Sequence, residues 1–416
     1  MQAKNKKMKE NFITNIKINK SRNIENFEIP LSQDNRQHLI ITGKNGSGKT
    51  SLLVEINKFF NQIESGDIQN YKSYKDSILD YKKMLQSETD STKISQHHTN
   101  IEHLHNDLNR FGGTQIDFSN SYNEMFRIYQ SGTFLVAFFD AKRQSNLTVP
   151  QGINKIDLKK RYNLNQKANP EFIQYIVNLK ADRSFARDEN ELETVKKIDK
   201  WFDKLENRLQ SIFDSNSLKL VFNRKTYNFD IIIDGLEPFN FNNLSDGYSA
   251  IISIVTELLL RMEAHNKKSY DLEGVVIIDE IETHLHVDLQ KKILPFLVDF
   301  FPRIQFILTT HSPFVLSSLS NATICDLEAK IITTDLTSYS YDALIESYFK
   351  SDKYSNEVKV KIFEFDMLVS KTNKTIEEKN ELRNLRNYFA HAPKYLSKEL
   401  LVRLQQIELS ELNTKK

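Results

Sequence analysis

The amino-acid sequence predicts an α/β protein in which a mainly parallel β-sheet is covered by helices on both faces. Three short apolar runs, at 38–42, 274–278 and 304–309, are typical of strands that are buried on both faces of such a sheet. Segments with helical spacing follow the first two runs, at 50–60 and 287–301. Strands that alternate with helices in this way are joined by the long crossover connections that parallel strands need.

The N-terminal part adds a strand pair and an insertion. Residues 12–31 alternate between apolar and polar side chains, which predicts two paired strands. Residues 61–112 are polar and almost free of glycine and proline, and their apolar residues recur every three or four positions. This spacing predicts two helices around a turn, most simply an antiparallel helical hairpin. Two interpretations stay open: the hairpin packs on its own domain, or it is an arm that contacts a partner or nucleic acid.

The middle of the chain supplies the remaining elements. Residues 114–120 and 133–144 are predicted as strands, and residues 156–214 as a charged helical stretch. Two further strands, at 218–223 and 227–234, are expected to form a pair.

Composition excludes several classes of protein. Lys and Arg number 57 and Asp and Glu 55, so the net charge of +2 predicts no general attraction to nucleic acid, although a local basic face is compatible with it. The single cysteine, Cys325, excludes an internal disulfide framework and a thiolate metal site, which fits a reducing cytoplasm. The N-terminal lysines precede no apolar segment, and no apolar run approaches the roughly 18 residues of a membrane span. We therefore expect a cytoplasmic protein without membrane contact.

The segment GKNGSGKT, residues 43–50, fits the P-loop pattern of a glycine, four residues and then Gly-Lys-Ser/Thr. Its glycines let backbone N–H groups turn inward around a chain of phosphates, and the following helix adds its positive N-terminal end. Lys49 is expected to reach the β- and γ-phosphates, and the Thr50 hydroxyl to coordinate Mg²⁺. The residues of the loop predicted to bind nucleotide are Gly43, Asn45, Gly46, Ser47, Gly48, Lys49, Thr50 and Ser51.

Two other predicted strands end in residues suited to nucleotide chemistry. One runs into Asp279, which can hold Mg²⁺ through its water shell, and Glu280, which can orient or deprotonate the attacking water. Another is followed closely by His311, a candidate donor to the γ-phosphate. Because the ends of parallel strands converge on the ligand, we predict Lys49, Glu280 and His311 as catalytic residues. Thr50 and Asp279 are the predicted metal ligands, and ATP and Mg²⁺ the predicted ligands of the site.

The order of these motifs resembles that of the ABC-type ATPases. The segments that carry the resemblance are GKNGSGKT, LSDGY, VVIIDEIETHLHVDLQ and LTTHSPFVLSS. Within this group the chain is similar to the small AAA-family ATPases of bacterial anti-phage systems, the PtuA-like subunit of Septu and retron systems, and more distantly to OLD-type proteins and SMC-like heads. The resemblance implies an ABC-type P-loop ATPase head, with a mixed, mainly parallel sheet, helices on both faces and an antiparallel β subdomain.

LSDGY is similar to the ABC signature, whose serine and glycine contact the γ-phosphate held by a second protomer. The resemblance therefore implies that Ser245 and Gly247 bind nucleotide across a dimer. The sequence departs from the family at Asp246, where many members have glycine, and at Tyr248, where many have glutamine.

The resemblance also assigns two loops. Residues 140–144 lie where the family's Q-loop is expected, so Gln144 or Arg143 would sense the γ-phosphate or the metal. The segment DEIETHLH resembles the D-loop region, which implies that Glu282 and His284 lie near a dimer seam.

These assignments predict an ATPase domain, an insertion within it and a C-terminal region. The ATPase domain comprises residues 1–60 and 113–334, with a helical subdomain at about 151–216. Residues 61–112 form the hairpin insertion and residues 335–416 a C-terminal helical region. The resemblance implies a homodimer that encloses nucleotide, and it leaves a larger oligomer open.

The sequence after His311 indicates which partners to expect. Beyond His311 the sequence contains no Asp-x-Asp, no further strand pattern after Thr334 and no His-rich cluster, so neither a Toprim nor an HNH nuclease is expected there. If the protein serves nuclease defence, a separate nuclease subunit should cut, with an HNH-type enzyme favoured and a Toprim-type enzyme as the alternative. DNA or retron nucleic acid is a further candidate partner.

Two alternative functions stay open. The first is an SMC-like ATPase that senses DNA structure through the hairpin and basic faces. The second is a ribonuclease in cis, because RNYFAH at 386–391 matches the Arg-x4-His element of HEPN ribonucleases through Arg386 and His391. The same six residues are also an ordinary way for a helix to end, since Pro393 follows them.

Overall fold

The computed structural model describes residues 10–164, 166–263, 272–344, 356–371, 373–390, 402, 405 and 406. The chain divides into two compact units, Met1–Tyr339 and Ser340–Lys416. Within the described residues every strand belongs to the first unit.

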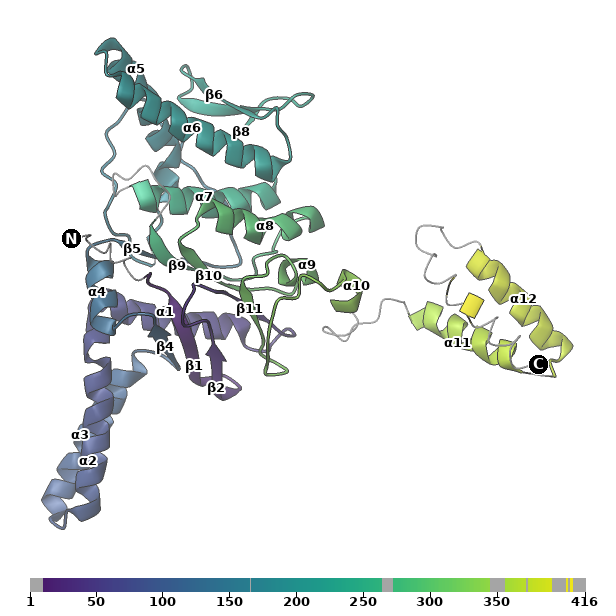
Figure 1. Cartoon of the computed structure of the whole chain (residues 1–416), viewed down its shortest axis with the longest axis horizontal. Coiled ribbons are helices and arrows are strands. Elements are labelled where there is room, and N and C mark those ends of the chain that lie inside the picture. Colours follow the sequence, from purple (N-terminus) through teal and green to yellow (C-terminus); the bar gives the residue numbers. More distant parts are fainter. Residues whose placement is uncertain are drawn as a thin grey trace, which may run out of the picture. The chain divides into compact units, whose positions relative to one another are not determined.

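A six-stranded sheet forms the centre of the first unit (Figure 1). In spatial order its strands are β12 (Ile331–Thr334), β11 (Ala322–Asp326), β3 (His38–Thr42), β10 (Ile304–Thr309), β9 (Glu273–Ile278) and β5 (Phe134–Phe139). All neighbours are parallel except the edge strand β12, which is antiparallel to β11. Every residue of β3 and β10 is buried, which explains why both strands are continuous apolar runs rather than alternating ones. The predicted α/β class is confirmed.

Helices cover both faces of this sheet (Figure 1). On one face lies α1 (Lys49–Ser65), which packs in turn against an antiparallel sheet of β2 (Ile24–Pro30), β1 (Ile13–Ser21) and β4 (Thr114–Phe118). On the other face lie α7 (Asp246–Glu263) and α8 (Val287–Phe300). One apolar core joins α1 to both sheets through Leu52, Ile56, Ile16 and Ile307. The mixed sheet with an antiparallel β subdomain therefore agrees with the expected ATPase head.

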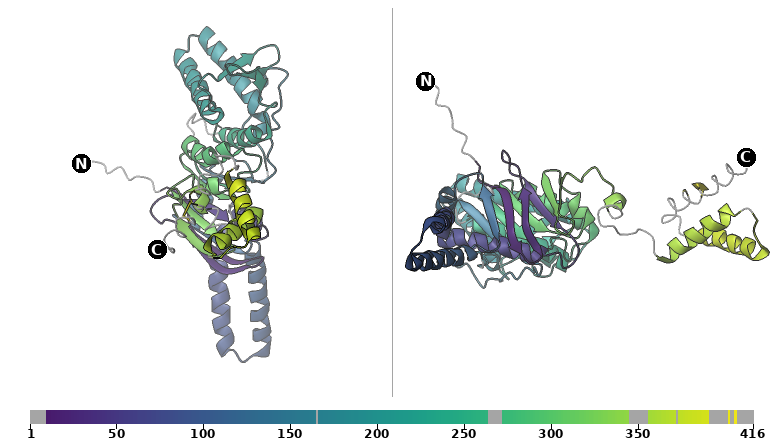
Figure 2. Two further views of the ribbon diagram at one scale, coloured as in Figure 1. Left: turned by 90° about the vertical axis from the view of Figure 1, so that its right-hand side faces the viewer. Right: turned by 90° about the horizontal axis from the view of Figure 1, so that it is seen from below.

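The segment after α1 forms a helical hairpin. After a short 3₁₀ turn, η1 (Asp67–Asn70), come α2 (Tyr71–Ser87) and α3 (Ser91–Asn109), which project away from the sheets (Figures 1 and 2). Rings of Tyr71, Phe111 and Phe59 pack together at its base. No residue of α3 is buried, and α2 buries Tyr71 and Ile78, so most of the hairpin surface faces solvent.

A second group of elements lies beyond α7. It contains η2 (Asn169–Glu171), α5 (Phe172–Asp188), α6 (Leu192–Phe213), β6 (Lys219–Asn223), β7 (Asn228–Ile232) and β8 (Phe239–Asn240). The prediction of helix from residue 156 is wrong for residues 156–164 and 166–168, because regular helix begins only at Phe172. Pro170 starts the helical turn, and the Glu257 carboxylate accepts the backbone N–H groups of Ala168 and Asn169 just before it. The short helix α4 (Tyr122–Gln130) was not predicted.

The first unit ends beyond β12, and α9 (Pro313–Leu316) lies between β10 and β11. The second unit contains α10 (Tyr341–Ala343), α11 (Asn356–Ser370) and α12 (Ile376–Ala390). Helices α11 and α12 share a small core of Ile362, Phe365, Val369, Leu382, Leu385 and Phe389.

His38, the first residue of β3, should make the fold sensitive to acid. Its Nδ1 accepts the Phe306 backbone N–H at 3.1 Å, and its ring stacks on Phe306. Burial, with a smaller contribution from Arg36, lowers the pKa of His38 to about 3. Because the unfolded chain binds this proton near pH 6.5 and the folded chain does not, the stabilisation is complete above pH 6.5. It is lost at about 1.4 kcal/mol per pH unit as the pH falls from there towards 3.

Urea unfolding of the wild type and of His38→Asn between pH 7.5 and 4.5 checks this expectation. Asparagine retains an acceptor but does not titrate, so the stability difference between the two proteins should change with that slope below pH 6.5. A difference that is independent of pH would contradict it.

Candidate nucleotide-binding site

Three neighbouring strands bring the predicted motifs to one edge of the central sheet. β10 lies between β3 and β9 and is parallel to both, so the carboxyl ends of all three strands point the same way. The P-loop follows β3, Asp279 and Glu280 follow β9, and His311 follows β10. The topology therefore places the phosphate-binding loop and the candidate catalytic residues side by side.

Three glycines shape the P-loop. Gly43, Gly46 and Gly48 all have positive φ angles, of 134°, 85° and 99°. A β-carbon on Gly43 would also come within 2.9 Å of the Ser47 Oγ. Residues with side chains rarely adopt such conformations, so the loop needs glycine where the backbone turns back on itself.

Lys49 is the first residue of α1, and only 6% of it is exposed. Its Nζ donates to the carbonyl oxygens of Gly43 at 2.8 Å and Lys44 at 3.0 Å. Burial lowers the pKa of Lys49, while Glu280 and Glu282 oppose that shift. The ammonium group is thus held inside the loop at the end of a helix, where it can meet a phosphate.

A cavity of about 560 Å³ opens in front of this loop. The predicted site residues that line it are Asn45, Gly46, Gly48, Lys49, Thr50, Ser51, Glu280 and His311. The predicted residues that do not line it are Gly43, Ser47, Gln144, Ser245, Gly247 and Asp279. Gly43 and Ser47 still belong to the loop, in which a side chain on Gly43 would collide with Ser47.

Asp279 and Glu280 are joined through Thr309. The Thr309 hydroxyl donates to Asp279 Oδ1 at 2.5 Å and accepts the Glu280 backbone N–H at 2.7 Å. Asp279 is buried and has a second carboxylate oxygen, while the Thr50 hydroxyl lies at the cavity. Oxygen donors of this kind fit Mg²⁺. Among the described residues no cluster of three His, Cys, Asp or Glu side chains could hold a metal, so a magnesium ion here would need phosphate oxygens and water as further ligands.

Arg143 was considered from the sequence as a phosphate sensor, and the structure gives it another role. Its guanidinium donates to the backbone carbonyls of Asp140 at 2.7 Å, Asp279 at 2.5 Å, Glu280 at 2.9 Å and Ile281 at 3.3 Å. It is only 4% exposed. Arg143 therefore fixes the turn that carries Glu280, whose φ of 44° is left-handed. Gln144 is exposed, and its contact with nucleotide stays a prediction.

His311 faces the cavity from the end of β10. Burial and the neighbouring Lys49 lower the pKa of its imidazole, which favours the neutral form of the ring. Its backbone N–H donates to Glu282 Oε1 at 2.5 Å. A neutral imidazole can donate one hydrogen bond to a phosphate oxygen from this position.

The signature turn lies outside this cavity. Ser245 and Asp246 are exposed where α7 begins, whereas Gly247 is buried. A β-carbon on Gly247 would approach the His284 carbonyl oxygen to 2.9 Å, so glycine is needed for packing against the turn that follows Glu280 in the same chain. The departure at Tyr248 also has a structural reason, because its ring stacks on Phe213 with centroids 4.2 Å apart.

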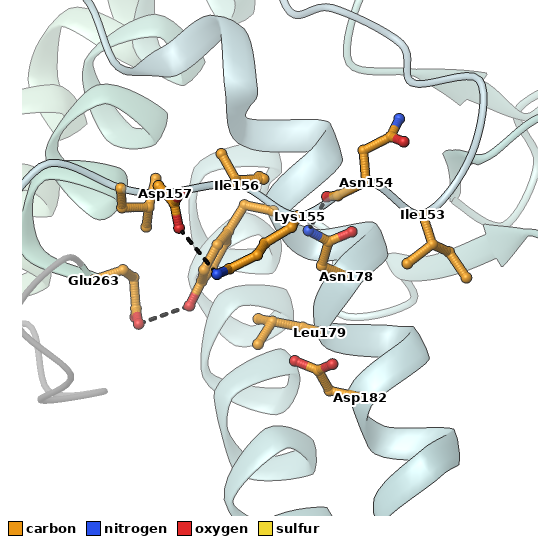
Figure 3. Close-up of a pocket in the computed structure, with 11 residues that line it drawn as sticks. Ile153, Asn154, Lys155, Ile156, Asp157, Asn178, Leu179, Asp182 and Glu263 are labelled. Atoms are coloured by element: carbon orange, nitrogen blue, oxygen red, sulfur yellow. Dashed lines mark hydrogen bonds and ion pairs between the residues drawn. The ribbon is translucent and has the colours of Figure 1, made fainter.

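The other end of α7 is fixed by Glu263 (Figure 3). Its two carboxylate oxygens accept hydrogen bonds from the Tyr175 hydroxyl and the Trp201 indole N–H, each at 2.7 Å. Beside it lies a second cavity, of about 690 Å³, at whose rim Lys155 pairs with Asp157. None of the predicted site residues lines it. The signature helix is therefore held at its far end by the helical segment that precedes it in the chain.

Arg22 is a residue of the nucleotide cavity that the sequence did not reveal. It lies exposed in the turn between β1 and β2, with a φ of 49°, and lines the same cavity as Lys49 and Thr50. Its proximity depends on how the antiparallel sheet packs over α1. No local pattern could have indicated that contact.

The two alternative functions depend on residues of the C-terminal region and of the hairpin. Arg386 lies exposed on α12, and His391 lies outside the described residues, so the ribonuclease hypothesis stays a prediction. The DNA-sensor hypothesis also stays a prediction, although the exposed hairpin would be free to make such contacts. Among the described helices, none is long and apolar enough to cross a bilayer.

Comparison with known proteins adds a family match. The family model described as "AAA domain, putative AbiEii toxin, Type IV TA system" matches residues 69–317. That range contains the signature turn, Glu280 and His311, and it begins after the P-loop.

Curated relatives include the Septu protein PtuA of Bacillus mycoides, 32% identical over 154 residues, which are 35% of this chain and 22% of the relative. The retron Vc95 probable ATPase of Vibrio cholerae is 29% identical over 166 residues, 37% of this chain and 32% of the relative. Septu protein PtuA of Bacillus thuringiensis is 29% identical over 223 residues, 49% of this chain and 53% of the relative. The chain thus spans about half or less of the length of each of these relatives.

Among solved structures, the chain is similar to the Smc head domain of Pyrococcus furiosus that was determined with an extended coiled coil and the C-terminal domain of ScpA. The TM-score is 0.37 and the identity 11%, over 78% of this chain and 95% of the other.

Proposed function

The chain belongs to the family of AAA domains described as putative AbiEii toxin, Type IV TA system, and on that premise we propose that it is an ATP-hydrolysing switch that regulates a separate nuclease in anti-phage defence. The single observation that carries the ATPase assignment is the cavity in which the P-loop, Glu280 and His311 meet. The similarity to Septu and retron ATPases supports the setting in defence.

The residues of the cavity divide the work of phosphoryl transfer. The P-loop backbone and Lys49 bind the β- and γ-phosphates, and Thr50 and Asp279 hold Mg²⁺, which neutralises charge on the phosphate oxygens when bound. Glu280 accepts a proton from the attacking water or orients it, and neutral His311 donates to the γ-phosphate. Arg143 and Thr309 keep Glu280 in place before the reaction, so little reorganisation is needed during it.

The position of the signature turn supports a head-to-tail dimer. Ser245 is exposed and lies away from its own chain's cavity, so in this proposal it serves the nucleotide of a second protomer. Two such contacts would form one symmetric interface that encloses two nucleotides. Because Gly247 packs against the backbone of His284, the D-loop segment that follows Glu280 also supports the turn offered to the partner.

A separate nuclease completes the proposal, with an HNH-type subunit as the first candidate and a Toprim-type subunit as the second. ATP binding would set the shape that the nuclease meets, and hydrolysis would reset it. Larger oligomers and direct contact with DNA or retron nucleic acid remain compatible with this arrangement.

Light scattering with and without a slowly hydrolysed ATP analogue and Mg²⁺ tests the switch. We expect the wild type to shift from monomer towards dimer with the analogue, and Lys49→Ala to show no shift because it lacks the phosphate-binding ammonium. Lys196→Ala is the matched control, because its exposed side chain pairs with Glu193 on the surface of α6 and does not line the cavity. Binding of the analogue without any change in mass would refute the dimer, and absence of binding would refute the nucleotide site itself.

A further inference from the structure

Glu282 links two of the loops at the nucleotide cavity. It lies in the turn after Glu280, and its Oε1 accepts the backbone N–H of His311 at 2.5 Å, across 29 positions of sequence. This is a contact between the loop that follows β9 and the loop that follows β10.

The surroundings of Glu282 are strongly charged. Burial lowers the pKa of Lys49, Arg143 and His311, and the Glu282 carboxylate opposes that shift in all three. Its second oxygen, Oε2, is buried and accepts no hydrogen bond within the described part of the chain. The Arg143 Nε is likewise buried without an acceptor there. Oε1 is therefore the oxygen that holds the His311 loop, and an uncharged oxygen acceptor in the same place could do the same.

We propose that Glu282 is a positioning residue for His311, holding the His311 backbone so that the imidazole stays at the cavity wall beside Lys49. The carboxylate itself does not line the cavity, and its hydrogen bond to the His311 backbone links it to a residue that does. This inference rests on the proposed function, in which His311 donates to the γ-phosphate. It adds the residue that keeps the His311 imidazole in position for its hydrogen bond to the γ-phosphate.

A double-mutant cycle with Glu282→Ala and His311→Ala tests the proposal. Losing a hydrogen bond to a charged acceptor should lower kcat about tenfold to one hundredfold in Glu282→Ala, with KM within about twofold of the wild type. The double variant should be no slower than His311→Ala alone, because Glu282 has nothing left to position. Glu282→Gln should retain most of the activity, since an amide oxygen still accepts the His311 N–H. His286→Ala, an exposed residue of the same segment, is the control.

A second measurement needs no turnover. We expect Glu282→Ala and His311→Ala to lose preference for a slowly hydrolysed ATP analogue over ADP by the same factor, whereas Glu282→Gln keeps it. Thermal unfolding of each variant identifies any that fail to fold, and Glu282→Leu, which also lacks an oxygen acceptor, takes the place of the alanine variant if that one does.

Additive losses in the cycle would overturn the proposal, as would equal losses in the glutamine and alanine variants. If the wild type neither hydrolyses ATP nor prefers the analogue over ADP, then the proposed function fails. If the wild type does both and the cycle is additive, only the role of Glu282 fails.

Discussion

Replacement of Glu280 by glutamine should slow ATP hydrolysis by about two to four orders of magnitude while leaving ATP binding intact. Glutamine has nearly the same shape, so the backbone contacts of this position with Thr309 and Arg143 persist. What is lost is the carboxylate that accepts a proton from the attacking water. Because nucleotide binds but is not consumed, the variant should accumulate in the ATP-bound dimer.

Steady-state phosphate release and light scattering with ATP check both parts of this expectation. Glu237→Gln is the matched control and should behave as the wild type, because Glu237 is exposed and does not line the nucleotide cavity. A Glu280→Gln protein that turns over ATP normally would remove Glu280 from the mechanism. One that dimerises no better with ATP than without it would contradict the nucleotide-enclosing dimer.

The central part of the fold was predictable because its signals are local. A buried strand in a parallel sheet is a short apolar run, and the residues that follow such strands share one edge, so the meeting of Lys49, Glu280 and His311 could be inferred from three separate segments. The hairpin was predictable for the same reason, since apolar spacing over two helices depends on neighbours three and four residues apart.

The missed features depend on contacts between distant segments. Arg143 is a charged residue after a strand, and nothing in its neighbourhood says that its guanidinium will bind three carbonyls of the turn at 279–281. Arg22 reaches the cavity only through the packing of the antiparallel sheet. The start of α5 was predicted too early because charged residues at 156–168 fit a helix as well as a loop. The buried Glu257 that accepts the backbone N–H groups there lies 88 and 89 positions away.

Two separate requirements explain why residue 247 is a glycine. The resemblance to the ABC signature explains this glycine by the approach of a partner's phosphate. The structure shows that it is also required within one chain, because a side chain would collide with the His284 carbonyl. Substitution of Gly247 therefore cannot separate dimer function from folding. Substitution of Ser245 can separate them, because its side chain is exposed. Its hydrogen bond to the helix comes from the backbone carbonyl, which accepts the Ser249 N–H at 2.8 Å.

Mixing two inactive proteins should restore ATP hydrolysis if the sites are shared between protomers. Lys49→Ala lacks a working P-loop, and Ser245→Arg places a bulky cation in the signature turn, so each protein alone should be inactive. In a head-to-tail mixed dimer both defects fall in the same site, and the other site combines an intact P-loop with an intact signature. Each mixed dimer keeps one of its two sites, so the mixture should recover a clear part of the wild-type rate, at most about half of it.

The control places both substitutions in one chain. A Lys49→Ala/Ser245→Arg double variant mixed with Lys49→Ala contains no intact P-loop and should stay inactive at every ratio. Recovery in the first mixture but not in the control would show that Ser245 acts on the nucleotide of the other chain, since no site within a single chain could produce that result. Full activity of Ser245→Arg alone would instead mean that its exposed turn serves neither nucleotide.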